Sequence, residues 1–199
     1  DRKMSKSLGN FSTVRQVAEQ IGYEPIRYFM LSAHYRSPLN FTMDILEQCK
    51  TSLERLYTCR ENLAFAIDNA GDTGENLLAE RAAEARRLFG ERMDDDLNTA
   101  DALAVLFDFV RDINTLAADS CKRVLLQTAE TFDALCEVLG LLYNRKDTKV
   151  PNKVLKLVEE RTEARTAKNW ARADEIRDAL DALGYTVEDT PAGPKVGRK

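Results

Sequence analysis

The spacing of apolar residues predicts α-helices along most of this 199-residue chain. Ser12 or Thr13 can cap a first helix that runs to about residue 20, and Pro25 stands at the first position of a second helix. The longest pattern covers residues 43–67, where apolar residues recur at helical intervals and predict one buried face (Ile45, Cys49, Leu53, Leu56, Leu63 and Ile67).

Three more helical patterns follow in the middle of the chain. The first is marked by apolar residues from Leu78 to Met93, and the second begins at a cap formed by Asn98 or Thr99. The third is expected over residues 125–143. Several helices joined by short loops pack as an antiparallel bundle, which is the fold that we expect for this part of the chain.

A polar stretch at residues 144–152 predicts a linker to a smaller unit. Two helices are expected there, at about 153–167 and 170–183, with Asn169 as the cap of the second and a short hairpin after it. We therefore expect a mainly α fold that consists of connecting helices, an antiparallel α-helical bundle and a small C-terminal α+β unit. A unit this small is marginally stable by itself.

Composition excludes some classes of protein. The chain has no run of apolar residues long enough to span a membrane and no secretory signal, so we expect a cytoplasmic protein without a membrane partner. The four cysteines lack the close spacing of a zinc site, and the single histidine, His34, adds no ligand pair. We expect free thiols and no metal site in this chain.

Charge is distributed unevenly, although the whole chain has a net charge of −4. Residues 1–43 carry a net charge of +3, residues 44–150 carry −8 and residues 151–199 carry +1. Proteins that hold nucleic acid along their whole length are basic throughout. We therefore expect any nucleic-acid contact to be local, near the two ends, with the acidic middle as a scaffold.

The segment Lys3-Met4-Ser5-Lys6-Ser7, followed by Leu-Gly-Asn, is the most specific motif in the chain. It resembles the KMSKS motif of class I aminoacyl-tRNA synthetases. The resemblance implies that these residues form an ATP-binding loop, with Lys6 as the main catalytic ammonium and Lys3 in support. Such ammonium groups meet the negative charge that develops as pyrophosphate leaves. The alternative is a solvated basic loop.

Two further segments narrow the resemblance. Residues 27–41 and residues 95–107 are similar to the stretch after KMSKS and to the helical DALR domain of cysteinyl-tRNA synthetases. The resemblance implies three domains. Residues 1–42 would end the catalytic domain with a region that contacts the tRNA stem, 43–147 would be a DALR-type bundle, and 152–199 would recognise the anticodon.

Arg36, His34 and a run of aspartates are candidate site residues near the bundle. The resemblance makes Arg36 a candidate phosphate contact, and a salt bridge to the acidic bundle is the equal alternative. His34 has no partner histidine or cysteine pair, so we interpret it as a structural, hydrogen-bonded residue. We interpret Asp94, Asp95 and Asp96 as helix-terminus charges rather than metal ligands.

The smaller unit holds the candidate RNA-reading residues. On a helical wheel the only tryptophan, Trp170, lies about 100° from the stripe of Ala173, Ile176, Leu180 and Leu183, so its indole is free to stack on an unpaired base. This surface resembles the anticodon-reading surface of bacterial cysteinyl-tRNA synthetases. That implies RNA contacts by Arg165, Trp170, Asp174 and Asp189. The alternative is a hydrophobic staple at Trp170 and a surface ion pair between Arg165 and Asp174.

The resemblance covers nearly the whole chain and implies that its parent is a cysteine–tRNA ligase, with tRNA-Cys as partner. The parent uses ATP as substrate and holds zinc, for which this chain contains no ligands. The HIGH-type histidines are also absent from the sequence, so we expect the chain to be an inactive, monomeric portion that lacks the N-terminal catalytic domain. The alternatives are a fragment of a cysteine–amino sugar ligase of mycothiol synthesis and a stand-alone RNA- or partner-binding helical module.

Overall fold

A computed structural model of the chain describes residues 12–145, 151–190 and 193–198. The chain divides into two compact units, the first ending at Asn144 and the second beginning at Arg145. We call them the bundle unit and the small unit and describe each by itself. The further division that we expect at residue 42 stays a prediction.

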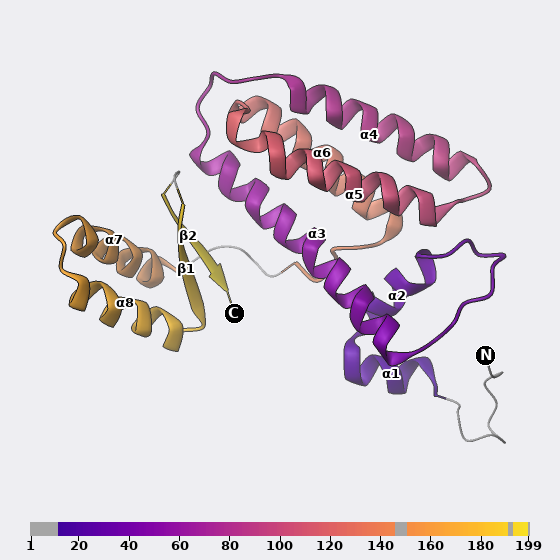
Figure 1. Cartoon of the computed structure of the whole chain (residues 1–199), viewed down its shortest axis with the longest axis horizontal. Helices are drawn as coiled ribbons and strands as arrows, with labels where there is room; N and C mark the ends of the chain where they lie inside the picture. The colour runs from indigo at the N-terminus through magenta and orange to yellow at the C-terminus, as the bar shows by residue number, and fades with distance from the viewer. Residues whose placement is uncertain (1–11, 146–150, 191–192, 199) are drawn as a thin grey trace. The chain divides into compact units, whose positions relative to one another are not determined.

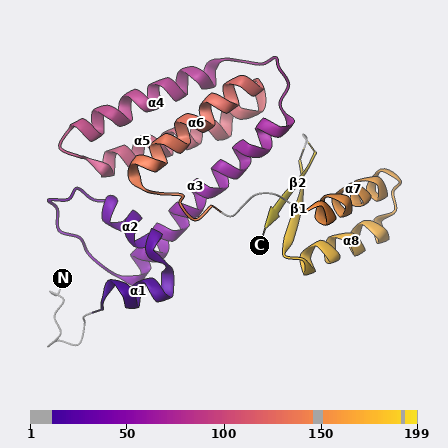
Figure 2. The same cartoon turned by 180° about the vertical axis from the view of Figure 1, so that it is seen from behind.

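The bundle unit consists of helices and one short 3₁₀ turn. In Figures 1 and 2, α4, α5 and α6 lie side by side, while α3 runs along them and continues to α1 and α2. The elements are α1 (Val14–Ile21), α2 (Tyr23–Leu31), α3 (Met43–Asn69), α4 (Leu77–Asp94), α5 (Thr99–Leu116), η2 (Ala117–Asp119) and α6 (Lys122–Leu139). This arrangement confirms the predicted helical bundle.

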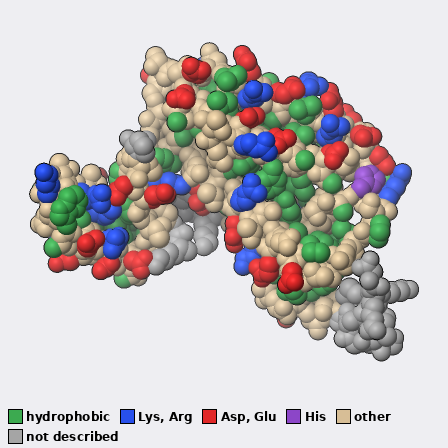
Figure 3. Space-filling model, in the orientation of Figure 1, with side chains coloured by type: hydrophobic (Ala, Val, Ile, Leu, Met, Phe, Trp, Pro, Cys, Tyr) green, Lys and Arg blue, Asp and Glu red, His purple; other side chains and the backbone are tan. Residues whose placement is uncertain are grey.

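The core of the bundle unit forms where the predicted apolar faces meet. Fully buried leucines and phenylalanines come from α3, α4, α5 and α6, and the rings of Phe109 and Phe132 pack with centroids 6.5 Å apart. Burial of this apolar surface is the main force that holds the helices together. Acidic and basic side chains are mixed over the visible outer face (Figure 3), as expected for a solvated surface.

Side-chain caps set the starts of several helices, because the first N–H groups of a helix have no partner within it. Thr13 and Gln16 form a capping box at α1, and the Oδ1 atom of Asn98 accepts from Asp101 N at 3.2 Å to begin α5. These observations confirm Thr13 and Asn98 as caps. Thr42 also caps α3, by accepting from Ile45 N at 3.2 Å.

The predicted start of α2 and the predicted end of α6 were wrong. Helix α2 begins at Tyr23, so Pro25 is its third residue rather than its first. Proline fits there because the N–H groups of the whole first turn have no intrahelical acceptor. Helix α6 ends at Leu139 instead of residue 143, because Gly140 adopts a left-handed backbone with φ of 63°. A Cβ at Gly140 would collide with the guanidinium of Arg27.

A buried carboxylate in α2 ties that helix to the end of α6. Glu24 is 2% exposed and accepts hydrogen bonds from Leu142 N, from the Tyr57 hydroxyl at 2.8 Å and from Asn144 Nδ2 at 3.1 Å. Burial and the bond to Glu24 raise the pKa of Tyr57. The sequence analysis missed this contact, because it joins residues more than 100 positions apart.

The small unit is an α-hairpin followed by a β-hairpin: α7 (Asn152–Thr166), α8 (Trp170–Ala182), β1 (Tyr185–Thr190) and β2 (Gly193–Arg198). The strands pair antiparallel, with Val187 opposite Val196. Its core is formed by Val154, Val158, Ile176 and Leu180, with Leu157, Tyr185, Val187 and Val196 packed against it. The predicted α+β unit is therefore confirmed.

The predicted inward position of Leu183 was wrong. Leu183 is 41% exposed, because α8 ends at Ala182 and the chain turns at Gly184, where φ is 82°. Leu183 is thus the C-terminal cap rather than a member of the helical stripe. None of the helices in the described ranges is long and apolar enough to cross a membrane.

Candidate nucleic-acid interface

The turn between α7 and α8 brings the candidate RNA-reading residues together. Arg161 and Arg165 lie one turn apart on α7, so their side chains emerge on the same side of that helix. Lys168 has a left-handed backbone with φ of 58°, and Asn169 then caps α8 by accepting from Arg172 N at 3.3 Å. The tight turn places Trp170, the first residue of α8, next to the end of α7.

Asp189 of β1 is the centre of this surface. Its Oδ1 and Oδ2 atoms accept hydrogen bonds from Arg161 Nη1 and Nη2 at 2.8 and 2.9 Å, in a bidentate ion pair. Arg165 Nη1 approaches Asp189 Oδ2 at 3.3 Å. The Arg165 guanidinium also lies over the Trp170 ring, with its carbon atom 5.7 Å from the ring centroid, which is cation–π geometry.

Burial and charge differ sharply within this group, which we call the Asp189 cluster (Arg161, Arg165, Trp170 and Asp189). Arg161 is 5% exposed, whereas Trp170 is 56% exposed. The hydrogen bonds from Arg161 lower the pKa of Asp189 below its usual range, and the bonds to Asp189 raise the pKa of Arg161. The cluster therefore presents an ionised carboxylate, a half-exposed guanidinium and an open aromatic face to solvent.

The ion pair of Arg165 differs from the one considered in the sequence analysis. Its ion pair is made with Asp189, so the pair between Arg165 and Asp174 that we considered is not the one formed. Asp174 instead lies 3.6 Å from Arg177, one turn along α8. The exposed indole of Trp170 does not fit a hydrophobic staple, whose side chains pack against each other.

Arg36 belongs to a second polar group, in the connection before α3. Asp96 Oδ2 lies 3.1 Å from Arg36 Nη1 and 3.7 Å from His34 Nε2, and Asp96 Oδ1 accepts from the Tyr35 hydroxyl at 2.8 Å. The His34 and Tyr35 rings stack with centroids 4.7 Å apart. The salt-bridge alternative for Arg36 is therefore formed, and its side chain remains 69% exposed. His34 is hydrogen-bonded as expected, since its Nδ1 accepts from Arg36 N.

The three aspartates do not all act as helix-terminus charges. Asp94 is the last residue of α4 and Asp95 its cap, but Asp96 follows in the turn with φ of 53°. Asp96 was misinterpreted, because its partners come from residues 34–36, about sixty positions away in the sequence.

The residues that the structure describes offer little support for a metal-binding or nucleotide-binding site. No group of three or more metal-binding side chains is found among the residues that the structure describes. The four cysteines there are buried thiols outside any disulfide, and burial raises the pKa of Cys59 to about 12. The Cys59 thiol is therefore a poor zinc ligand, since a zinc ligand must be a thiolate. Lys3, Met4, Ser5, Lys6 and Ser7 lie outside the described residues.

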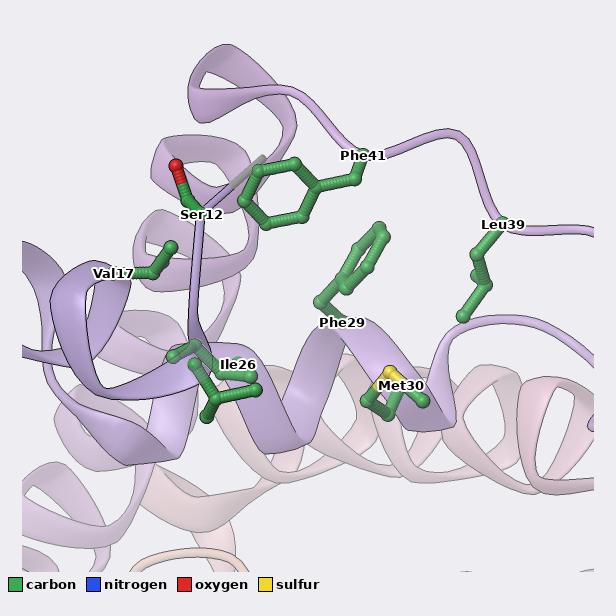
Figure 4. Close-up of a pocket in the computed structure, with 8 residues that line it drawn as sticks. Ser12, Val17, Ile26, Phe29, Met30, Leu39 and Phe41 are labelled. Carbon is green, nitrogen blue, oxygen red and sulfur yellow. The ribbon is translucent and has the colours of Figure 1, made fainter. Parts of the chain in front are cut away.

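A hollow of about 240 Å³ lies between α1, α2 and the connection to α3. Figure 4 shows the rings of Phe29 and Phe41 beside it, together with the side chains of Ile26, Met30 and Leu39. Among the described residues that line it, Ser12 has the only polar side chain. The lining that the structure describes therefore offers apolar contact and no charged group for a phosphate.

Comparison with known proteins agrees with these observations. Residues 1–51 match the model of the class I (C) tRNA synthetase catalytic domain, residues 88–143 match the DALR domain, and residues 147–194 match the cysteinyl-tRNA ligase anticodon binding domain. The chain belongs to the cysteinyl-tRNA synthetase family. The Asp189 cluster lies within the segment that matches the anticodon binding domain.

Relatives in this family match the chain along nearly its whole length. It is 50% identical to the cysteine–tRNA ligase of Caldicellulosiruptor saccharolyticus over 202 aligned positions, which cover 100% of this chain and 43% of that protein. It is 44% identical to the cysteine–tRNA ligase of Halalkalibacterium halodurans, over 97% of this chain and 42% of that protein. The chain thus spans less than half the length of these synthetases.

The fold also resembles a solved synthetase structure. The LeuRS–tRNA–LeuAMS ternary complex of Agrobacterium radiobacter K84 matches with a TM-score of 0.50 at 18% identity. The match covers 71% of this chain and 21% of that one. At this identity the likeness concerns the fold alone.

Arg161 is the functional candidate that the sequence analysis missed. A signal was present, because Arg161 continues the apolar stripe of α7, three positions after Val158 and three before Ala164, both of which are buried. A charge at a core position requires a partner. The sequence does not show that this partner is Asp189.

Proposed function

We propose that the chain is the tRNA-binding portion of a cysteine–tRNA ligase and that the Asp189 cluster reads the anticodon of tRNA-Cys. The observation that carries this proposal is the open face of Trp170 beside Arg165 and Asp189, within residues that match an anticodon binding domain. An exposed aromatic ring stacks on an unpaired base, and arginine and carboxylate groups hydrogen-bond to base edges.

Each residue of the surface has a role in this proposal. Trp170 stacks on a base, Arg165 donates to acceptors on a base edge, and Asp189 and Asp174 accept from amino or imino hydrogens. Arg36 contacts a phosphate once its ion pair with Asp96 opens, which its exposure allows. In the complete ligase, Lys3 and Lys6 meet the phosphates of ATP during cysteine activation, with Met4, Ser5 and Ser7 completing the loop.

The match of residues 147–194 to an anticodon binding domain favours a tRNA ligase over a cysteine–amino sugar ligase. A cysteine–amino sugar ligase has no anticodon to read. The match of residues 1–51 to a catalytic domain likewise favours an enzyme over a stand-alone binding module.

The proposal is tested by binding of the purified chain to a tRNA-Cys transcript with the GCA anticodon and to one with an altered anticodon, at two salt concentrations. We expect tighter binding to the GCA transcript, and weakening of both complexes by salt as phosphate contacts are screened. The substitution Trp170→Ala should weaken GCA binding by about 1–3 kcal/mol, because it removes a stacking platform.

The matched control is Leu183→Ala, which shortens another exposed apolar side chain of the small unit outside the cluster. It should leave the affinity for the GCA transcript unchanged. Equal binding of both transcripts by the wild-type chain would contradict the proposal, and so would wild-type affinity for the GCA transcript in the Trp170→Ala variant, since stacking contributes to binding whatever the base.

A further inference from the structure

The small unit buries a guanidinium in its small core, at a cost that an apolar side chain would avoid. Arg161 is 5% exposed, and its Nε atom has no hydrogen-bond partner among the described residues. A buried ion pair contributes little net stability, and its replacement by apolar residues is often neutral or favourable. Stability alone therefore gives a weak reason for an arginine at this position.

The geometry of the ion pair shows what Arg161 does. Its two Nη atoms hold both oxygens of Asp189, so the carboxylate plane is fixed by two parallel hydrogen bonds. An ionised carboxylate accepts at about four positions, and Arg161 occupies one on each oxygen. The Asp189 side chain is 46% exposed, so acceptor capacity remains on the solvent side.

The same pair determines where Arg165 lies. Since Arg161 already matches the charge of Asp189, Arg165 makes one longer contact of 3.3 Å to Oδ2 and stays over the Trp170 ring. Without Arg161, Arg165 would be the remaining cation in contact with Asp189. The preference of arginine for bidentate pairing would then draw its guanidinium from the ring toward the carboxylate.

We propose that Arg161 is a positioning residue for anticodon reading, which orients Asp189 as an acceptor and leaves Arg165 over Trp170 for contact with a base. This inference rests on the proposed function. Arg161 itself is buried and touches no base. A role confined to folding would instead lower the stability of the small unit and leave base discrimination intact.

The test uses the full chain with Arg161→Met and Arg161→Lys, and RNA hairpins that carry the GCA loop or a loop with one base changed. Trp170 is the only tryptophan, so its fluorescence in the free protein reports the position of the Arg165 guanidinium. Arg161→Met should reduce discrimination between the hairpins about tenfold, the size of one base contact, and change the Trp170 emission. Arg161→Lys should give a smaller loss of about threefold, because an ammonium cannot hold both oxygens in a fork.

The matched control is Arg172→Met, at an exposed arginine of α8 that pairs with Glu160 and Glu175 at 3.4 and 3.0 Å. It makes the same chemical change in the same unit, at an arginine that forms no ion pair with Asp189. Discrimination and Trp170 emission should equal those of the wild-type chain. Thermal unfolding of each variant gives the temperature below which binding is compared.

Each outcome has a definite meaning. Wild-type discrimination and emission in folded Arg161→Met, together with a lower unfolding temperature, would show that Arg161 only stabilises the unit. If Arg161→Met does not fold, wild-type discrimination in Arg161→Lys overturns the inference equally. Absence of discrimination in the wild-type chain would contradict the proposed function, and with it this inference, whereas discrimination that survives both substitutions contradicts the inference alone.

Discussion

The bundle unit and the small unit hold their elements together in different ways. In the bundle unit, helices α3–α6 bury a continuous apolar core that includes fully buried leucines and phenylalanines. In the small unit, the buried apolar cluster consists of Val154, Val158, Ile176 and Leu180, and Arg161 lies among the buried residues of the same helix. The bundle unit is thus held together mainly by apolar contacts, whereas the candidate RNA-reading surface of the small unit is organised around the buried charge of Arg161.

The polar clusters of the two units differ in the same way. Glu24 is buried and its carboxylate is occupied by donors from α3 and from the segment after α6, so it acts as an internal anchor. Asp189 is held by two hydrogen bonds from Arg161 but keeps 46% of its side chain exposed. A buried carboxylate with several donors connects secondary-structure elements within the fold. A carboxylate that stays partly exposed can also accept a hydrogen bond from a binding partner.

The largest expected effect is on the free energy of unfolding, when a leucine is shortened to alanine in the core of each unit. Leu139 and Leu180 are each 1% exposed and lie near the ends of α6 and α8. Leu→Ala at such a site costs about 2–5 kcal/mol. We expect Leu180→Ala to unfold the small unit, because a unit of this size has little stability to lose. Leu139→Ala should lower the unfolding midpoint of the bundle unit and leave it folded.

Two probes separate the units in a denaturant titration. Trp170 fluorescence reports the small unit, and far-UV circular dichroism is dominated by the long helices of the bundle unit. If Leu180→Ala shifted both signals together, the two units would unfold as one and the comparison would fail.

A smaller effect is expected from two glycines of the bundle unit. Gly140→Ala combines a left-handed backbone with a collision between the new Cβ and Arg27, and should cost roughly 1–3 kcal/mol. Gly90 lies inside α4 with open space around it, so Gly90→Ala should stabilise the unit by about 0.5–1 kcal/mol. Urea unfolding followed by circular dichroism measures both, and equal effects in the two variants would contradict this account.

The smallest expected effect is the change in the stability of the small unit with pH. The pKa of Asp189 is lowered in the folded chain by Arg161, so its ion pair stabilises the fold above the unfolded pKa of about 3.9 and is lost as the pH falls through the folded value. The unfolding midpoint reported by Trp170 should therefore decrease below about pH 5. The decrease is modest, because Asp189 is half exposed.

The control for this pH dependence is a pair of variants. Asp189→Asn should flatten the decrease between pH 5 and pH 3, since no carboxylate remains to be protonated at this position. Asp178→Asn, at an exposed position of α8, should leave the decrease as in the wild-type chain. A decrease of the same size in all three proteins would show that the ion pair with Arg161 has no part in it.

The sequence alone determined the helices, several of their caps and the class of fold. Apolar residues at helical spacing and caps such as Thr13, Asn98 and Asn169 act within one or two turns of chain, so their effect can be predicted locally. The same local reasoning predicted the open face of Trp170. It failed at the end of α6, because the apolar spacing was followed to Tyr143 past Gly140, although a glycine is itself a local helix-ending signal.

Only the tertiary structure decided which charged groups meet. Arg165 pairs with Asp189 rather than Asp174, and Asp96 receives His34, Tyr35 and Arg36 from a distant connection. An ion pair forms where two side chains of opposite charge come within a few ångströms in space. A charged residue can therefore pair with any oppositely charged residue that the fold brings near it, however distant in sequence. Helix periodicity places a side chain on a face, but the packing of other elements against that face selects its partner.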